Sequence, residues 1–208
     1  MAKDKGKKSA EHGPEDSGPP VPPRLRERYR NEVSQAVAEK FGLDNPMERP
    51  KIEKIVLNVN MGRHLEGIKI PVNVKETVLS TLTQVSGQKP VVIKAKKSVA
   101  NFKVREGSET SAMVTLRRER MWHFLDRLVN LATPRIRDFR GVPTASFDKA
   151  GNYSMGLTEQ GVFPEIDMTK VNFTHGMPIN IVFANSNPER SRFVLEQLGM
   201  PFRRPETK

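Results

Sequence analysis

The chain has 208 residues, of which 35 are Lys or Arg and 24 are Asp or Glu, so its formal charge is +11. It contains no cysteine, which excludes disulfides, thiolate zinc sites, iron–sulfur clusters and a cysteine nucleophile. An excess of positive charge attracts polyanions, so nucleic acid is the leading class of partner.

The sequence predicts a cytoplasmic protein without a membrane segment. No run approaches the roughly 20 apolar residues that span a bilayer, and the first residues lack the apolar core of a secretion signal. Residues 1–23 are rich in proline and carry balanced charges, which predicts a disordered extension. Residues 24–208 are expected to form a single domain.

The first predicted helix begins at Arg24. Its apolar residues recur at every fourth position and precede a glycine suited to the end of a helix, namely Leu25, Tyr29, Val33, Val37, Phe41 and Gly42. A strand follows at 54–59, where alternation places Asn58 on the face opposite Leu57 and Val59. Pro71 is predicted to open a second helix that ends at Gly87.

The second half of the chain is predicted to add strands at 90–94, 111–117, 152–157 and 179–184. A third helix over 121–132 ends at Pro134, and its Trp122 is expected in the core rather than stacked on a base. A last helix follows Ser186 and Glu189, which have capping-box spacing. These elements predict an α+β fold, a mostly antiparallel sheet with helices packed on one face.

The sequence contains no arrangement typical of an active site or a metal site. The four histidines lie far apart, and no phosphate-cradling glycine loop or nucleophile motif occurs. The chain is therefore predicted not to be an enzyme and to need neither a metal nor a cofactor. The alternative is a small RNA-modifying or hydrolytic enzyme that uses Glu165 and Asp167 as an acid–base pair.

Basic side chains gather in loops rather than along one helix. No acid occurs from Pro90 to Arg105, and the cations of this stretch flank small residues that let a backbone approach phosphates closely. Its like charges and few apolar anchors predict that residues 94–105 are mobile without RNA.

A second basic cluster has two possible roles. Arg135, Arg137 and Arg140 are expected either to bind phosphates or to pair with acids inside the protein. Because no predicted helix carries a basic recognition face, RNA is preferred to DNA as the partner. A DNA-binding or chromatin-like protein is the alternative.

Six short motifs in order along the chain resemble those of one family. They are SGQKP at 86–90, KAKKSVA at 94–100, VTLRRERMW at 114–122, PRIRDFRG at 134–141, GNYSMG at 151–156 and FPEI at 163–166. Together they look like bacterial large-subunit ribosomal protein five, the 5S-rRNA-binding family of the central protuberance. The resemblance covers about residues 24–204.

The resemblance implies a structural constituent of the ribosome that helps to attach 5S rRNA to the large subunit. Matched by motif, the implied rRNA contacts are Asn58, Gln88, Thr115 and Arg117. The implied loop facing the P-site tRNA carries Lys94, Lys96, Lys97, Ser98, Lys103 and Arg105. The stretch 146–165 is implied to form a bridge to small-subunit protein thirteen. Large-subunit rRNA and other central-protuberance proteins are further implied partners.

One position departs from the family pattern. After the strand the family has Asn, one residue, Gly, one residue and Gly, whereas this chain carries Asn60 at the first glycine position. Since Asn tolerates a positive φ better than other non-glycine residues, the turn is expected to survive, with its local RNA contact in question.

Overall fold

The structure is a computed structural model that describes residues 21–62, 69–169, 171 and 173–203. Most of the extension predicted to be disordered, residues 1–20, lies outside this part. The elements follow the chain in the order α1 (Arg24–Arg28), a π turn (Tyr29–Val33), α2 (Ser34–Phe41), β1 (Lys51–Asn60), α3 (Val72–Ser86), β2 (Val91–Lys94), a 3₁₀ turn (Ala100–Phe102), β3 (Glu109–Leu116), α4 (Arg118–Arg127), a π turn (Leu128–Ala132), two 3₁₀ turns (Thr133–Arg135 and Thr144–Ser146), β4 (Tyr153–Leu157), a 3₁₀ turn (Gln160–Val162), β5 (Met177–Ala184) and α5 (Pro188–Gln197).

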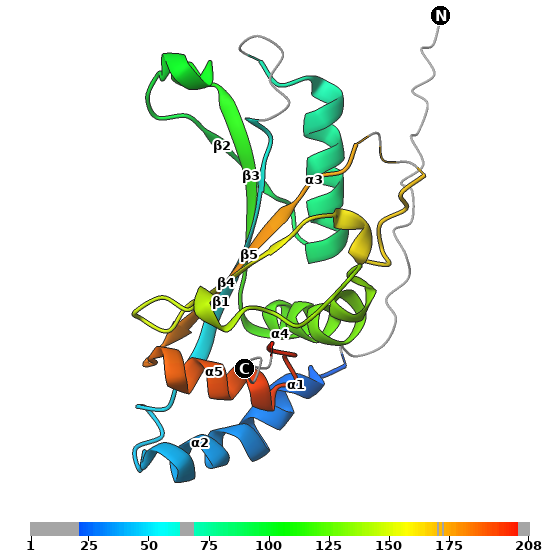
Figure 1. The fold of residues 1–208 in the computed structure, drawn as a ribbon. Coiled ribbons are helices and arrows are strands. Elements are labelled where there is room, and N and C mark those ends of the chain that lie inside the picture. The colour runs from blue at the N-terminus through cyan, green and yellow to red at the C-terminus, as the bar shows by residue number, and fades with distance from the viewer. Residues whose placement is uncertain (1–20, 63–68, 170, 172, 204–208) are drawn as a thin grey trace, which may run out of the picture.

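The five strands form one antiparallel sheet in the order β2-β3-β1-β5-β4 (Figure 1). The first strand of the chain, β1, is therefore central, and its Leu57 lies opposite Val114 of β3 and Ile179 of β5. Side chains alternate between the two faces of a strand, and here one face is buried while the other is partly exposed. The predicted α+β fold with a mostly antiparallel sheet is confirmed.

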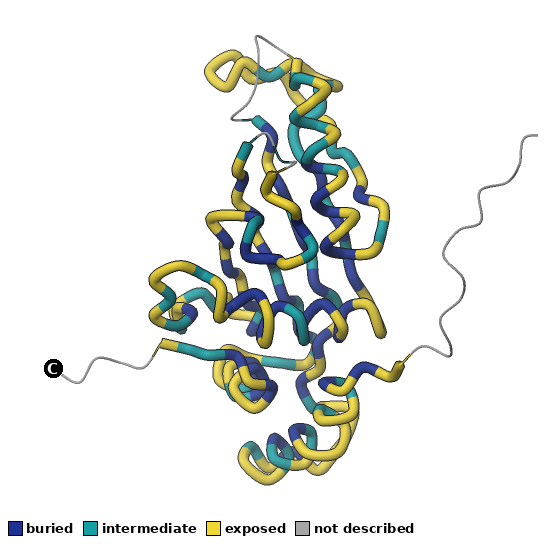
Figure 2. The backbone as a smooth tube through the Cα atoms, turned by 90° about the vertical axis from the view of Figure 1, so that its right-hand side faces the viewer, coloured by how far each residue is buried: buried dark blue, intermediate teal, exposed yellow. Residues whose placement is uncertain are grey.

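Helices α3 and α4 cover the apolar face of the sheet, while α1, α2 and α5 lie beyond α4 at one end (Figure 1). Leu82 of α3 and Phe124 of α4 are fully buried in this layer. Trp122 is only 7% exposed and its ring lies 5.5 Å from that of Tyr29, so the predicted core position is confirmed. Figure 2 shows the buried backbone concentrated in the strands and in the helix sides that face them. None of the helices in the described residues is both long and apolar enough to span a membrane.

A π turn in the N-terminal helical segment accounts for the apolar residues that recur at every fourth position. In an α-helix of 3.6 residues per turn, every fourth residue drifts about 40° around the axis. A π turn holds one extra residue, which turns the stripe back toward the core. Leu25, Val33 and Val37 are all buried, and Gly42 ends α2 with a φ of 63°. The predicted stripe and helix end are thus confirmed.

The last helix begins one residue later than its capping-box spacing indicates. Asn187 is the N-cap, and its side-chain oxygen accepts a hydrogen bond of 2.8 Å from the backbone N–H of Arg190. Ser186 instead shares a hydrogen bond of 2.7 Å with Ser191. Because Pro188 suits the first helical position, where no N–H donor is needed, the residue before it takes the cap.

Asn60 does not adopt the positive φ that its place in the motif suggested. It is the last residue of β1, paired with Ser111 of β3, and its side-chain oxygen accepts a hydrogen bond of 2.8 Å from the N–H of Gly62. A side-chain bond to a backbone two residues on is a turn that Asn forms readily. The turn therefore begins in extended backbone and does not require a glycine at position 60.

The segment after α5 returns to the middle of the chain. Val142 and Phe202 form a parallel bridge, with hydrogen bonds of 2.9 Å from Val142 N–H to Pro201 and from Arg203 N–H to Val142. Gly141 has a φ of 96°, and a Cβ there would lie 2.7 Å from the backbone nitrogen of Arg203. The aromatic rings of Phe147, Tyr153 and Phe202 pack together beside this bridge.

Candidate nucleic-acid interface

The sheet face turned away from α3 and α4 is here called the open face. Its residues on the three inner strands and on β4 are Lys54, Val56, Asn58, Ser111, Met113, Thr115, Ser154, Gly156, Asn180 and Val182. Asn58 pairs with Met113, and Val56 pairs with Thr115. Asn58 and Thr115 are therefore diagonal neighbours on adjacent strands, within reach of one ligand.

Gln88 lies in the connection between α3 and β2, and Arg117 lies in the connection between β3 and α4. Both connections are at the same end of the sheet. Arg117 directly follows β3 and is the N-cap of α4, and its side chain is exposed. The pairing of β2 with β3 starts at Val91 and Met113, so antiparallel direction brings Gln88 alongside the end of β3 that leads to Arg117. Ser86 fixes the backbone here, since its hydroxyl accepts a 3.2 Å hydrogen bond from the Gln88 N–H.

The four side chains predicted to bind rRNA share one chemical property. Within the described residues, the side chains of Asn58, Gln88, Thr115 and Arg117 form no hydrogen bond or ion pair. The Oδ1 atom of Asn58 is even buried without a donor. A buried polar atom without a partner costs free energy, and a donor supplied by a bound molecule removes that cost.

A cationic groove of about 940 Å³ adjoins Arg117. It is lined by five cations, Arg26, Lys51, Arg117, Arg118 and Arg120, and by only two acids, Glu53 and Glu119, together with apolar side chains. Glu119 is engaged by Arg26, at 3.0 Å. The sequence analysis singled out Arg117 and the motif that contains it, but it did not show that Lys51 and Arg26 would lie beside them. These two cations come from distant segments that only the folded chain brings to this corner.

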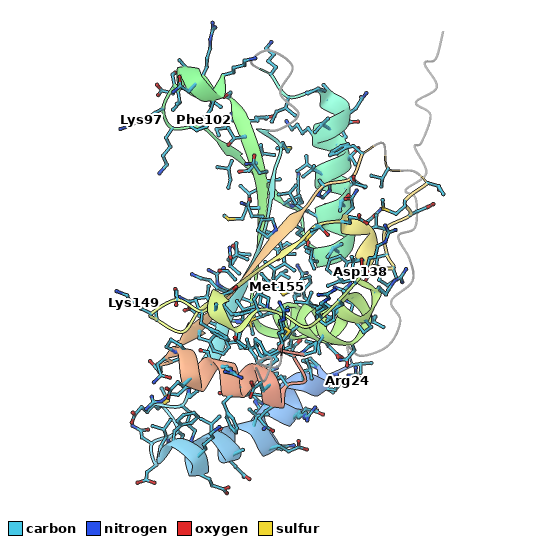
Figure 3. All side chains as sticks on the ribbon, viewed as in Figure 1. Arg24, Lys97, Phe102, Asp138, Lys149 and Met155 are labelled. Carbon is cyan, nitrogen blue, oxygen red and sulfur yellow. The ribbon has the colours of Figure 1, made fainter. Side chains whose placement is uncertain are left out.

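The basic loop is a hairpin that extends β2 and β3, and residues 94–105 are here called the basic hairpin. Its cations Lys94, Lys96, Lys97, Lys103 and Arg105 are exposed and form no ion pair within the part that the structure describes. Ser98 links the two arms of the hairpin, because its hydroxyl accepts a 2.9 Å hydrogen bond from the Glu106 N–H. Figure 3 shows Lys97 at the tip, far from the main body of the protein.

Arg117 and the basic hairpin lie at opposite ends of β3. Arg117 follows the last residue of this strand, whereas the hairpin joins it at Glu109. Eight residues of strand span about 26 Å. The residues predicted from the sequence therefore form two separate surfaces, one on the sheet and one on an arm.

The second basic cluster lies on a surface loop anchored by apolar residues. Ile136 and Phe139 pack against the core, while Arg135, Arg137 and Arg140 are exposed. None of the three arginines forms an ion pair with a described residue, so the expected alternative of internal pairing is not observed. They are free to bind phosphates.

Glu165 and Asp167 do not form an acid–base pair. Glu165 binds the guanidinium of Arg127 at 2.5 Å, and Arg127 also donates to the backbone carbonyl of Val85. Asp167 accepts hydrogen bonds from the N–H and the hydroxyl of Thr169. Among the described residues no group of acids and histidines is arranged to hold a metal ion. Both carboxylates thus serve to hold the chain in place.

Comparison with known proteins gives one consistent result. The family model for ribosomal protein L5 matches residues 45–105, and the model for the C-terminus of the same ribosomal protein family matches residues 109–202. The chain is 49% identical over 179 residues to the large ribosomal subunit protein uL5 of Caldanaerobacter subterraneus subsp. tengcongensis, covering 86% of this chain and 98% of the relative. The uL5 proteins of Syntrophotalea carbinolica and Clostridium tetani are 48% and 51% identical, with 86% of this chain and 95% and 98% of those relatives covered.

Proposed function

This chain belongs to the ribosomal protein L5 family, and on that premise we propose that its open face binds 5S rRNA and helps to attach it to the large subunit in the central protuberance. Membership makes the chain a structural constituent of the large ribosomal subunit and not an enzyme, as the sequence predicted. It also agrees with the predicted location in the cytoplasmic ribosome.

The observation that carries the proposal is a set of four side chains on and beside the open face that have no hydrogen-bond or ion-pair partner among the described residues. Asn58 and Thr115 are short neutral groups held on the sheet, whereas Gln88 and Arg117 lie on the connections beside it, where Arg117 adds one charge. Folded RNA is recognised through its shape and its hydroxyl and phosphate groups, which suits hydrogen-bonding groups fixed in space. The groove beside Arg117 supplies further cations for the backbone of large-subunit rRNA.

A double substitution tests the site. We expect Gln88→Ala with Arg117→Ala to weaken 5S rRNA binding by about tenfold or more, because two contacts, one of them charged, are lost. The matched control is Arg30→Ala with Gln35→Ala, two exposed residues of the same types in the N-terminal helical segment. Equal affinity of the double variant and the control would remove this site.

Duplex DNA distinguishes the proposal from general polyanion binding. A surface that recognises only charge binds duplex DNA and 5S rRNA similarly at physiological salt, since phosphate contacts carry no sequence information. We expect a clear preference for 5S rRNA, lost in the Gln88 and Arg117 double variant. Comparable affinity of the wild-type protein for both molecules would instead favour the DNA-binding alternative.

The basic hairpin is proposed to reach the P-site tRNA. Its support is geometric and electrostatic, because the arm that projects from the body carries five cations with no ion-pair partner in the described part of the chain (Figure 3). Replacing Lys97 by Ala is expected to speed the release of P-site tRNA and to reduce its dependence on salt. An unchanged release rate would argue against this contact.

The stretch 146–165 is proposed to bridge to small-subunit protein thirteen. It contains β4, an edge strand with one side unpaired by the other strands, and the exposed turn around Lys149 (Figure 3). Edge strands and exposed turns are common sites of contact between chains. We expect the large and small ribosomal subunits to associate more slowly with Lys149→Glu than with Lys149→Ala. Equal association rates for both variants and the wild type would contradict the proposed bridge.

A further inference from the structure

The tip of the basic hairpin exposes an aromatic ring. Phe102 is 74% exposed, whereas every other Phe of the described residues is at least partly buried. Its ring contacts no other aromatic ring of the described chain. Val99 beside it is 41% exposed. Apolar surface left in water gains none of the stabilisation that burial gives, so this mostly exposed ring contributes little to the stability of the isolated chain.

The backbone of the tip holds the ring in a defined place. Val99 and Val104 exchange two hydrogen bonds, of 2.9 and 3.2 Å. A 3₁₀ turn over Ala100–Phe102 closes between them, and Lys103 leaves it with a φ of 52°. The ring is thus carried by the turn at the end of the hairpin, where Figure 3 labels Phe102. When this turn is formed, its hydrogen bonds present the ring to solvent, where a partner can cover it.

The surroundings of the ring are cationic. Lys97 and Lys103 lie on the same tip, and neither forms an ion pair with a described residue. A purely electrostatic contact with phosphates needs no exposed ring. An aromatic plane among cations is instead the combination that binds unpaired nucleotides, where the ring stacks on a base and the cations neutralise the backbone.

We propose that the ring of Phe102 stacks on an unpaired base of the P-site tRNA. This inference depends on the proposed contact between the basic hairpin and tRNA, and it names the group that the hairpin recognises. The recognised group is the face of a base in a tRNA loop, not the backbone of a duplex. The neighbouring lysines bind the flanking phosphates.

The test uses ribosomes in which the only copy of this protein carries a substitution. Release of P-site tRNA is measured over a range of potassium concentrations for Phe102→Ala, Phe102→Leu and Phe102→Trp. Met47→Ala is the matched control, because Met47 is 72% exposed and lies in the connection between α2 and β1. Chemical probing of the bound tRNA reports which unpaired bases are covered.

We expect Phe102→Ala and Phe102→Leu to speed release about fivefold or more, since stacking on one base contributes about 1–3 kcal/mol. Phe102→Trp keeps the wild-type rate, and Met47→Ala changes nothing. The salt dependence stays that of the wild type in Phe102→Ala but falls in Lys97→Ala. One unpaired tRNA base is covered in the wild type and in Phe102→Trp, and it becomes reactive in Phe102→Ala.

Two outcomes overturn the inference. Wild-type release with Phe102→Leu shows a general apolar contact, such as a protein pocket, and wild-type release with Phe102→Ala shows no contact of the ring. If Lys97→Ala alone has an effect, the tRNA contact stands and only stacking fails. If neither substitution has an effect, the proposed tRNA contact fails as well. Unchanged 5S rRNA binding and unfolding of each variant verify that the protein is intact.

Discussion

The open face runs along β3 and the basic hairpin extends beyond the start of that strand, and the two surfaces are built in opposite ways. The open face rests on a core in which Leu57 and Leu116 are fully buried, and its predicted contacts are mostly neutral groups. The basic hairpin has no fully buried residue, and its predicted contacts are mostly lysines. A rigid platform can present short groups in fixed positions, whereas an arm without a core depends on charge and reach.

The same substitution in the core behind the open face and in the basic hairpin gives the largest expected difference. Phe124→Ala is expected to lower the free energy of unfolding by about 3–5 kcal/mol, because a fully buried ring leaves a cavity. Phe102→Ala is expected to change it by no more than about 0.5 kcal/mol, because that ring is exposed. Urea denaturation measures both. A similar loss in the two variants would show that the hairpin belongs to the folded core.

Hydrogen exchange sharpens the comparison at the level of the backbone. Amides of β1 and β3 that pair within the sheet are expected to exchange about a thousandfold more slowly than those of Val99 and Val104. The reason is that the hairpin opens without disturbing buried apolar contacts. The predicted mobility of the free hairpin is tested by the same measurement, and strong protection at its tip would contradict it.

Asn58 offers a substitution with opposite effects on folding and binding. Asn58→Val removes an amide oxygen that is buried without a donor and places a β-branched residue in a strand, so the free protein is expected to gain about 1 kcal/mol of stability. Binding of 5S rRNA is expected to weaken. Lys97→Ala, the control on the basic hairpin, should leave stability unchanged. Destabilisation by Asn58→Val would mean that the amide serves the fold.

The buried hydroxyl of Tyr153, in β4, should make the stability of the protein depend on pH in the alkaline range. The hydroxyl donates a 3.0 Å hydrogen bond to the carbonyl of Pro143, and burial raises its pKa to about 12. Since the pKa of Tyr in an unfolded chain is about 10, its contribution is fully present below that pH and is lost as pH rises toward about 12. Tyr153→Phe is expected to cost about 1 kcal/mol at neutral pH.

The pH dependence of this cost supplies the check. The difference in unfolding free energy between wild type and Tyr153→Phe should shrink between about pH 10 and 12, because only the wild type loses the contribution of the protonated hydroxyl. A difference that stays constant over this range would show that the phenol is not shielded from solvent. Urea denaturation of both proteins at several alkaline pH values measures it.

Much of the scaffold followed from periodicity and from glycine positions. The alternation around Leu57 predicted β1, and Gly42 and Gly87 end α2 and α3 with the left-handed backbone that glycine adopts easily. These features are local, because a helix stripe or an alternating strand is written within ten to twenty residues. The placement of Asn58 and Thr115 on one face followed from the same alternation.

The features that the sequence did not show depend on contacts between distant segments. Lys51 joins the groove at Arg117 only because β1 pairs beside β3, and Phe202 reaches Val142 only after α5 has packed. The lack of a donor for Asn58 depends on all of its neighbours at once. Both Ser186 and Asn187 can cap the last helix. Asn187 is the cap because Pro188 suits the first helical position.

The strand order has a consequence for how the chain is made. β1 is synthesised early, yet it lies between β3 and β5, and β5 follows it by more than a hundred residues in the sequence. A nascent chain can pair β1 with β3, but the other edge of β1 has no partner strand until Met177–Ala184 has left the ribosome that makes it. We expect the sheet to close only near the end of translation.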